Sequence, residues 1–199
     1  MTAEPTTARG RATRDRIVSR VAAAVAEHGV RGASLEQLLA AAGASKSQFV
    51  HYFGGREQLM AAAVAYQCEQ FLAGLTQAFA SVRTLAELRR TIEGFVEQYE
   101  RDPAGCPIGS MASDVAGHNE PARVHLSDAF AAWERLFEEA FTRIRAAGEL
   151  RPDAPPDVLA TALLASLEGG MLLSQVRRDG AALRIAVDSA LGFVGTFAA

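Results

Sequence analysis

The chain has 199 residues, of which 49% are hydrophobic and 22% are charged, a balance that is typical of a soluble globular protein and excludes long disorder. Residues 1–60 carry eight Lys and Arg against five Asp and Glu, a net charge of +3 that leaves −6 for the remainder, so the N-terminal end is suited to a partner that carries phosphate. Cys68 and Cys106 are the only cysteines and lack CxxC spacing, so neither a disulfide scaffold nor a zinc site is predicted, and the reducing cytoplasm is the expected compartment.

Helical periodicity dominates the chain. Apolar residues recur at spacings of three and four, and no alternating run of strand length occurs, so we predict an all-α protein of about nine helices. Residues 1–12 show no such pattern and are expected to form a flexible arm. The first helix is predicted over residues 13–28, because Gly29 follows as a helix-terminating glycine.

Two short helices follow in close succession. A capping box of the form Ser-x-x-Gln begins at Ser34, and another begins at Ser45. In such a box the serine and the glutamine each satisfy a free backbone N–H group, so each box predicts a helix start. Gly43 is expected to end the first of these helices, and Gly54 the second.

Longer helices make up the rest of the chain. We predict them at about residues 56–82, 84–101, within 105–117, and at 121–147, 157–177 and 181–197. Residues 158–176 are nearly all apolar and about as long as a bilayer crossing. Glu168 and Gln175 interrupt this stretch and no basic residues flank its N-terminal side, so a buried helix is expected there.

Residues 34–53 have the arrangement of a helix-turn-helix, namely a capped helix, a turn at Gly43 and a second capped helix. Phe49 and Phe53 are expected to face the core of a three-helix unit. The same spacing also fits a simple packing unit with a solvated polar face. The side chains left on the outer face are suited to base edges (Ser47, Gln48, Val50) and to phosphate (Lys46, His51, Tyr52).

This segment closely resembles the DNA-binding signature of the TetR family of bacterial repressors. The resemblance rests on SLEQLLAAAGASKSQFVHYF at residues 34–53 and on GREQL at residues 55–59, and it covers roughly residues 12–60. More loosely, GCPIGSMA at 105–112 and LLASLEGGMLL at 163–173 resemble the C-terminal domain of the lincomycin-resistance-repressor-like subgroup. Val50 departs from the pattern, because many members carry there a tyrosine that contacts the DNA backbone.

The resemblance implies a homodimeric transcriptional repressor that binds a near-palindromic double-stranded DNA operator and is released by a small, largely apolar effector. Residues 13–56 would form the DNA-binding domain, and residues 57–199 a domain that binds the effector and dimerises. No cofactor, metal or membrane partner is expected.

The predicted site residues fall into three groups. Contacts to DNA are predicted for Arg14, Ser34, Ser45, Lys46, Ser47, Gln48, Val50, His51, Tyr52 and Arg56. The effector pocket is predicted to involve Phe71, Leu75, Phe95, Tyr99, Cys106, Met111, Phe130, Trp133, Phe137 and Glu168. The dimer interface is predicted to involve Leu159, Leu163, Leu167, Met171, Leu183, Val187 and Leu191. Aromatic residues at helical spacing also fit an ordinary core.

Other interpretations stay open. A helical enzyme is disfavoured, because no nucleophile elbow, phosphate-binding loop or paired-histidine metal helix occurs. A DNA-binding protein whose body senses no ligand is a second alternative. Glu168 requires a partner, which is either structural or part of a ligand. Cys106 is expected to be an inert buried thiol. The spacing of Asp114, His118, Glu120 and His125 fits no metal site.

Overall fold

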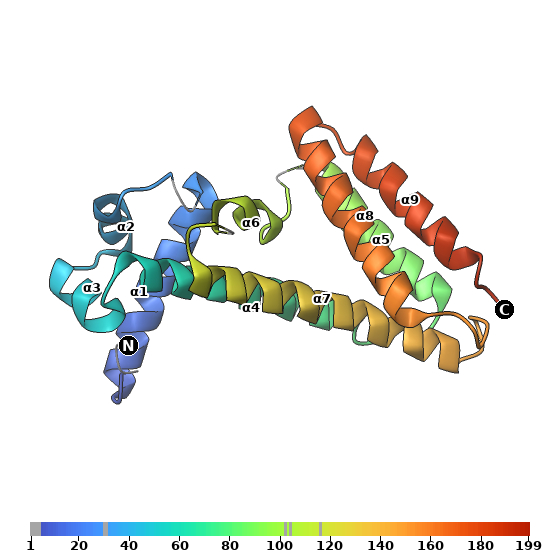
Figure 1. The fold of residues 1–199 in the computed structure, drawn as a ribbon, viewed down its shortest axis with the longest axis horizontal. Helices are drawn as coiled ribbons and strands as arrows, with labels where there is room; N and C mark the ends of the chain where they lie inside the picture. Colours follow the sequence, from blue (N-terminus) through green and yellow to red (C-terminus); the bar gives the residue numbers. More distant parts are fainter. Residues whose placement is uncertain (1–4, 30–31, 102, 104, 116) are drawn as a thin grey trace. The chain divides into compact units, whose positions relative to one another are not determined.

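A computed structural model describes residues 5–29, 32–101, 103, 105–115 and 117–199 (Figure 1). Within these residues the chain forms nine α-helices and no strand, which confirms the predicted all-α class. The helices are α1 (Ala8–His28), α2 (Leu35–Ala42), α3 (Lys46–Phe53), α4 (Arg56–Phe79), α5 (Leu85–Arg101), α6 (Gly109–Val115), α7 (Glu120–Ala146), α8 (Pro156–Arg177) and α9 (Ala181–Gly195).

Two compact units divide the chain. Unit 1 comprises Met1–Phe71 and Pro107–Ala129, and unit 2 comprises Leu72–Cys106 and Phe130–Ala199. The chain therefore passes between the units inside α4, between Cys106 and Pro107, and inside α7, and the predicted boundary between residues 56 and 57 differs from all three. In unit 1 the Gln67 side-chain amide donates to the Ala22 carbonyl at 2.9 Å, and the Asn119 amide donates to the Glu57 carbonyl at 3.0 Å. These bonds tie the first half of α4 to α1 and to the start of α7.

Helix α1 begins at Ala8, several residues before the predicted start at residue 13. The Thr7 hydroxyl accepts a hydrogen bond from the Gly10 N–H at 3.1 Å, which caps the helix. The Arg11 guanidinium also donates to the carbonyls of Pro5 and Thr6. The prediction of a flexible arm over residues 1–12 is therefore wrong for residues 8–12, and its first four residues lie outside the described part of the chain.

Aromatic residues from α4 and α7 pack in the core of unit 2. The Phe79 and Phe137 ring centroids are 5.0 Å apart, those of Trp133 and Phe137 are 5.9 Å apart, and Trp133 and Phe137 are buried. The Arg143 guanidinium donates to the Phe79 and Val82 carbonyls at 3.0 and 3.1 Å. Helix α4 ends at Phe79 and does not continue to Val82 as predicted, and Arg143 satisfies carbonyls at this end.

Helices α8 and α9 pack along each other in unit 2 (Figure 1). Gly170 permits a close approach, since a Cβ atom there would lie 2.8 Å from the Leu183 Cα atom. The Ser174 hydroxyl accepts a hydrogen bond from the Leu183 N–H at 3.0 Å. Among the described helices, α8 has the length and hydropathy that a membrane crossing requires. One side of α8 is nevertheless buried within the chain, as predicted for a core helix.

Candidate functional site

Helices α2 and α3 of unit 1 form a helix-turn-helix with defined caps. Both predicted capping boxes are present, at the starts of α2 and α3. Gly43 ends α2 with φ +57° and ψ +42°, a left-handed conformation that favours glycine. The Arg16 guanidinium donates to the Ala42 carbonyl at 2.6 Å, so α1 holds the last turn of α2. Phe49 and Phe53 are buried as predicted, and the Arg14 guanidinium lies 5.6 Å from the Phe53 ring centroid.

The outer face of α3 presents four of the predicted DNA-contacting residues to solvent. Lys46, Ser47, Val50 and His51 are exposed, and Val50 is 60% exposed although it is apolar. Tyr52 is half-buried and its ring packs edge-on against His51, with centroids 4.7 Å apart. This face therefore combines the positive charge of Lys46, the hydroxyl of Ser47 and the two methyl groups of Val50. These groups suit a phosphate, a base edge and a thymine methyl, respectively.

Three of the predicted DNA contacts serve as helix caps in the structure. The Gln48 side-chain oxygen accepts from the Ser45 N–H at 3.0 Å, and the Ser45 hydroxyl accepts from the Gln48 N–H at 3.1 Å. The Ser34 hydroxyl accepts from the Gln37 N–H in the same way. A bidentate contact of Gln48 to adenine needs that same side-chain oxygen. In the structure the Gln48 side-chain oxygen is engaged in the cap, so its predicted base contact, which stays a prediction, would have to share or replace this bond.

Arginines of α1 and α4 surround the helix-turn-helix. The Arg56 guanidinium, for which a DNA contact was predicted, donates to the Ala33 carbonyl at 2.8 Å. This bond fixes the start of α4 to the segment before α2. Arg16 and Arg20 lie beside the turn, because a Cβ atom on Gly43 would be 3.8 and 3.5 Å from their guanidinium groups. The predicted contact list lacks these two residues. Their four-residue spacing on the polar face of the first helix is the signal that points to them.

The predicted effector residues do not form one group within either unit. Phe71 and Met111 belong to unit 1, and the other eight belong to unit 2. In unit 2, Phe130 stacks on Trp133 at 6.3 Å between centroids, as part of the aromatic core. Leu75 and Phe95 are half-buried, and the Phe95 ring lies 6.3 Å from that of Tyr99.

Tyr99, Cys106 and Glu168 form a polar cluster in unit 2. The Tyr99 hydroxyl donates to the Met171 carbonyl at 2.8 Å and accepts from the Gly105 N–H at 3.0 Å. The Cys106 thiol donates to the Glu168 carboxyl, whose Oε1 atom is buried and has no hydrogen-bond partner among the described residues. Burial raises the pKa of Glu168 above its usual range, and burial also raises the pKa of Tyr99.

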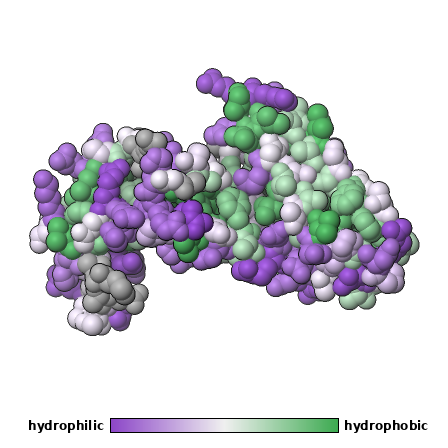
Figure 2. Space-filling view, viewed as in Figure 1, coloured by the Kyte–Doolittle hydropathy of each residue, from purple (hydrophilic) through white to green (hydrophobic). Residues whose placement is uncertain are grey.

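The residues predicted for the dimer interface lie on the inner sides of α8 and α9. Leu159, Leu163, Leu167, Met171, Leu183, Val187 and Leu191 are all buried within the single chain. In the single chain these side chains are already covered by neighbouring residues, and their role in a dimer interface stays a prediction. The exposed apolar side chains of these two helices are Val158, Leu172, Leu173, Val176, Ile185 and Phe193. Figure 2 shows hydrophobic residues at the surface around α8 and α9.

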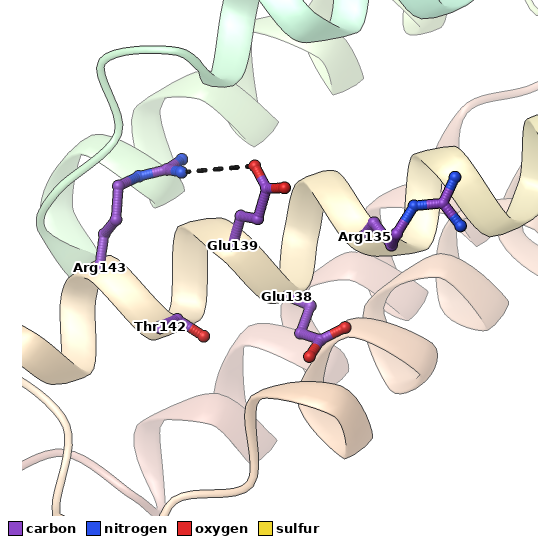
Figure 3. A pocket seen from close by; sticks show the side chains of 5 residues that line it. All are labelled: Arg135, Glu138, Glu139, Thr142 and Arg143. Atoms are coloured by element: carbon purple, nitrogen blue, oxygen red, sulfur yellow. Dashed lines mark ion pairs between the residues drawn. The ribbon is translucent and has the colours of Figure 1, made fainter.

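Two surface hollows are built from other residues. The side chains that line a hollow of about 440 Å³ all project from α7 (Figure 3), and one of them, Arg143, pairs with Glu139 at 3.8 Å. A second, of about 670 Å³, lies in unit 1 among α1, α4 and α7 and includes Arg14 and His125. Neither contains a residue predicted to bind the effector. Within the described residues no three His, Cys, Asp or Glu side chains gather as metal ligands.

Comparisons with known proteins give concordant results. The family described as "Bacterial regulatory proteins, tetR family" matches residues 17–63, and "Tetracyclin repressor-like, C-terminal domain" matches residues 84–190, more than half of the chain. An uncharacterized HTH-type transcriptional regulator of Mycobacterium tuberculosis is 29% identical over 175 residues, which span 83% of this chain and 86% of that relative. The HTH-type transcriptional repressor DhaR of Mycobacterium sp. strain GP1 is 25% identical over 159 residues, 77% of each chain. A TetR family regulator from Cytophaga hutchinsonii has the same fold, with a TM-score of 0.83 at 19% identity and 98% of each chain covered.

Proposed function

The chain belongs to the TetR family of bacterial transcriptional regulators, which are not enzymes, and we propose that it is a repressor that binds a near-palindromic operator as a homodimer and is released by a small effector. The observation that carries this proposal is the exposed face of α3 in a capped helix-turn-helix. Its relative DhaR is named a transcriptional repressor, which supports the same direction of regulation here. The cytoplasm, where the operator lies, is the proposed compartment.

Base contacts are proposed for Ser47 and Val50, and phosphate contacts for Lys46 and His51. Val50 is well suited to a thymine methyl group, because its side chain is apolar and 60% exposed on an otherwise polar face. Arg16 and Arg20 extend the positive charge to the turn before α3. A helix of this length contacts few base pairs, so two copies related by a twofold axis are needed for a specific site.

A dimer is supported by the exposed apolar residues of α8 and α9. Leu172 is 59% exposed, Val176 is 76% exposed and Ile185 is 66% exposed, which leaves a hydrophobic surface that a second copy would cover. Gly169 and Gly192 have open space beside their Cα atoms, so another helix can approach closely there. We therefore assign the interface to the exposed sides of these helices.

Selection of duplex DNA by the purified chain tests the proposal. Sequencing of bound duplexes from a random library should return one near-palindromic site, and fluorescence anisotropy should show tighter binding to it than to a scrambled duplex. Val50→Ala should weaken binding to the selected duplex and leave the scrambled duplex nearly unchanged. Lys46→Ala should weaken both and reduce the slope of affinity against salt by about 1.

Val124→Ala is the matched control, because Val124 is an exposed valine on α7. It should bind both duplexes like the wild type. Recovery of no enriched sequence would contradict the proposal, as would an equal loss on both duplexes in Val50→Ala.

A further inference from the structure

Glu168 places a carboxyl group in the apolar helix α8. Its Oε1 atom is buried and has no partner among the described residues. The thiol of Cys106 donates to the carboxyl, but a thiol is a weak donor. A buried polar atom without a partner is unfavourable, and such atoms are rare in native proteins, so this one calls for a partner.

Neighbouring groups do not supply the missing donor. The Tyr99 hydroxyl lies in the same cluster, but its proton is directed to the Met171 carbonyl at 2.8 Å. The Gly105 N–H donates to the Tyr99 oxygen at 3.0 Å and is also engaged. Among the described residues, no basic side chain acts electrostatically on Glu168. None of the described residues therefore supplies this donor, and the group most complementary to a buried carboxyl oxygen without a partner is a cation.

The surroundings of this cluster suit an organic cation. The Phe95 and Tyr99 rings lie side by side on α5, with centroids 6.3 Å apart, and Phe95 is half-buried. Aromatic faces attract a cation and its apolar substituents. A fully hydrated inorganic ion would gain little from such walls, whereas an amine with an alkyl or aryl group would use both the carboxyl and the rings.

We propose that Glu168 anchors the protonated nitrogen of a small organic amine in unit 2, beside the Phe95 and Tyr99 rings. In this arrangement the amine N–H donates to Oε1 of Glu168 while the Cys106 thiol keeps its bond to the carboxyl. The inference rests on the proposed function in one respect, since it makes this amine the effector that lowers operator affinity.

The test compares three ligand series on the full-length chain: primary alkyl and arylalkyl amines, the alcohols of the same carbon skeletons, and the corresponding carboxylates. Isothermal titration calorimetry and thermal unfolding report binding. Amines should bind the wild type and raise its unfolding temperature, while the alcohols bind more weakly and the carboxylates do not bind. If no amine binds, or if the alcohols bind as tightly as the amines, the cationic site is refuted.

Glu168→Gln removes the charge at constant size and should weaken amine binding roughly 10- to 100-fold, the factor for one charge-assisted hydrogen bond. Glu138→Gln, on an exposed part of α7, changes the net charge equally and should leave binding unchanged. Equal affinities of Glu168→Gln and the wild type would overturn the proposal. Glu168→Asp keeps the charge but shortens the side chain, so it should retain part of the affinity and provides a second variant if the first unfolds.

Operator binding on the same preparations separates the two proposals. A chain that binds its selected duplex but no amine retains the proposed function and loses this inference. A chain that binds amines at Glu168 but selects no duplex retains the site and loses the proposed function. An amine that binds without changing operator affinity refutes the effector role.

Discussion

The reciprocal capping of Ser45 and Gln48 leads to a specific prediction about Gln48→Ala. This variant removes the acceptor that lies 3.0 Å from the Ser45 N–H at the start of α3. Loss of a capping interaction costs about 0.5–2 kcal/mol. In a chain of 199 residues each 1 kcal/mol lowers the unfolding temperature by about 2–4 °C, so a measurable drop is expected.

The effect on DNA binding should follow from this loss of order in α3. Because no base contact is removed, Gln48→Ala should weaken binding to the selected and the scrambled duplex by the same factor. Ser45→Ala should behave alike, and the double variant should cost less than the sum of the two single variants, since both belong to one pair of bonds.

Gln37→Ala is the matched control. Gln37 accepts from the Ser34 N–H at 2.8 Å in the equivalent box of α2, so its stability loss should be similar. The measurements are thermal unfolding by circular dichroism and anisotropy titrations with both duplexes. The capping role is refuted if Gln48→Ala unfolds at the wild-type temperature and its affinity falls about tenfold or more for the selected duplex alone. A loss of this size is within the range expected for one base contact. Gln48 would then leave its cap to read a base.

Three further outcomes are expected. Gly43→Ala should lose about 1–2 kcal/mol of unfolding free energy, because φ is +57° at this position. Gly94→Ala, in the interior of α5, should be neutral or stabilising. Equal effects of the two variants in thermal unfolding would contradict this prediction. Ile185→Glu should convert the dimer to a monomer in sedimentation velocity experiments, while Val124→Glu should not; a dimeric Ile185→Glu chain would place the interface elsewhere. The pKa of Glu87 is lowered by the backbone N–H groups of Arg83 and Thr84, so its contribution to stability is complete above the usual glutamate pKa and is lost as pH falls through the lowered value. Glu87→Gln should therefore unfold with a shallower pH dependence on the acid side, and an unchanged acid limb would be evidence against this role.

The helices were predictable because their signals are local. Both capping boxes, the glycine ends of α2 and α3 and the periodicity of the later helices were all read from neighbouring residues, and the structure confirms them. The start of α1 was missed because its capping residue, Thr7, lies in a stretch without apolar periodicity.

The site was predictable only in part, because its details depend on contacts between distant residues. The sequence shows that α8 and α9 are apolar on more than one side, but it does not show which side packs against the rest of the chain. Leu183 and Leu172 look alike in the sequence, although one is buried and the other is 59% exposed. Arg56 could be assigned to a phosphate on its type alone, whereas its bond to the Ala33 carbonyl depends on the folded turn.

Asn119 joins three backbone segments of unit 1. Its N–H donates to the Val115 carbonyl at the end of α6, its side-chain oxygen accepts from the Ala122 N–H in α7, and its amide donates to the Glu57 carbonyl in α4. These segments share one buried side chain, so their amide protons should exchange with solvent through a common opening event. A disturbance at the first turn of α7 would therefore loosen the residues that directly follow α3.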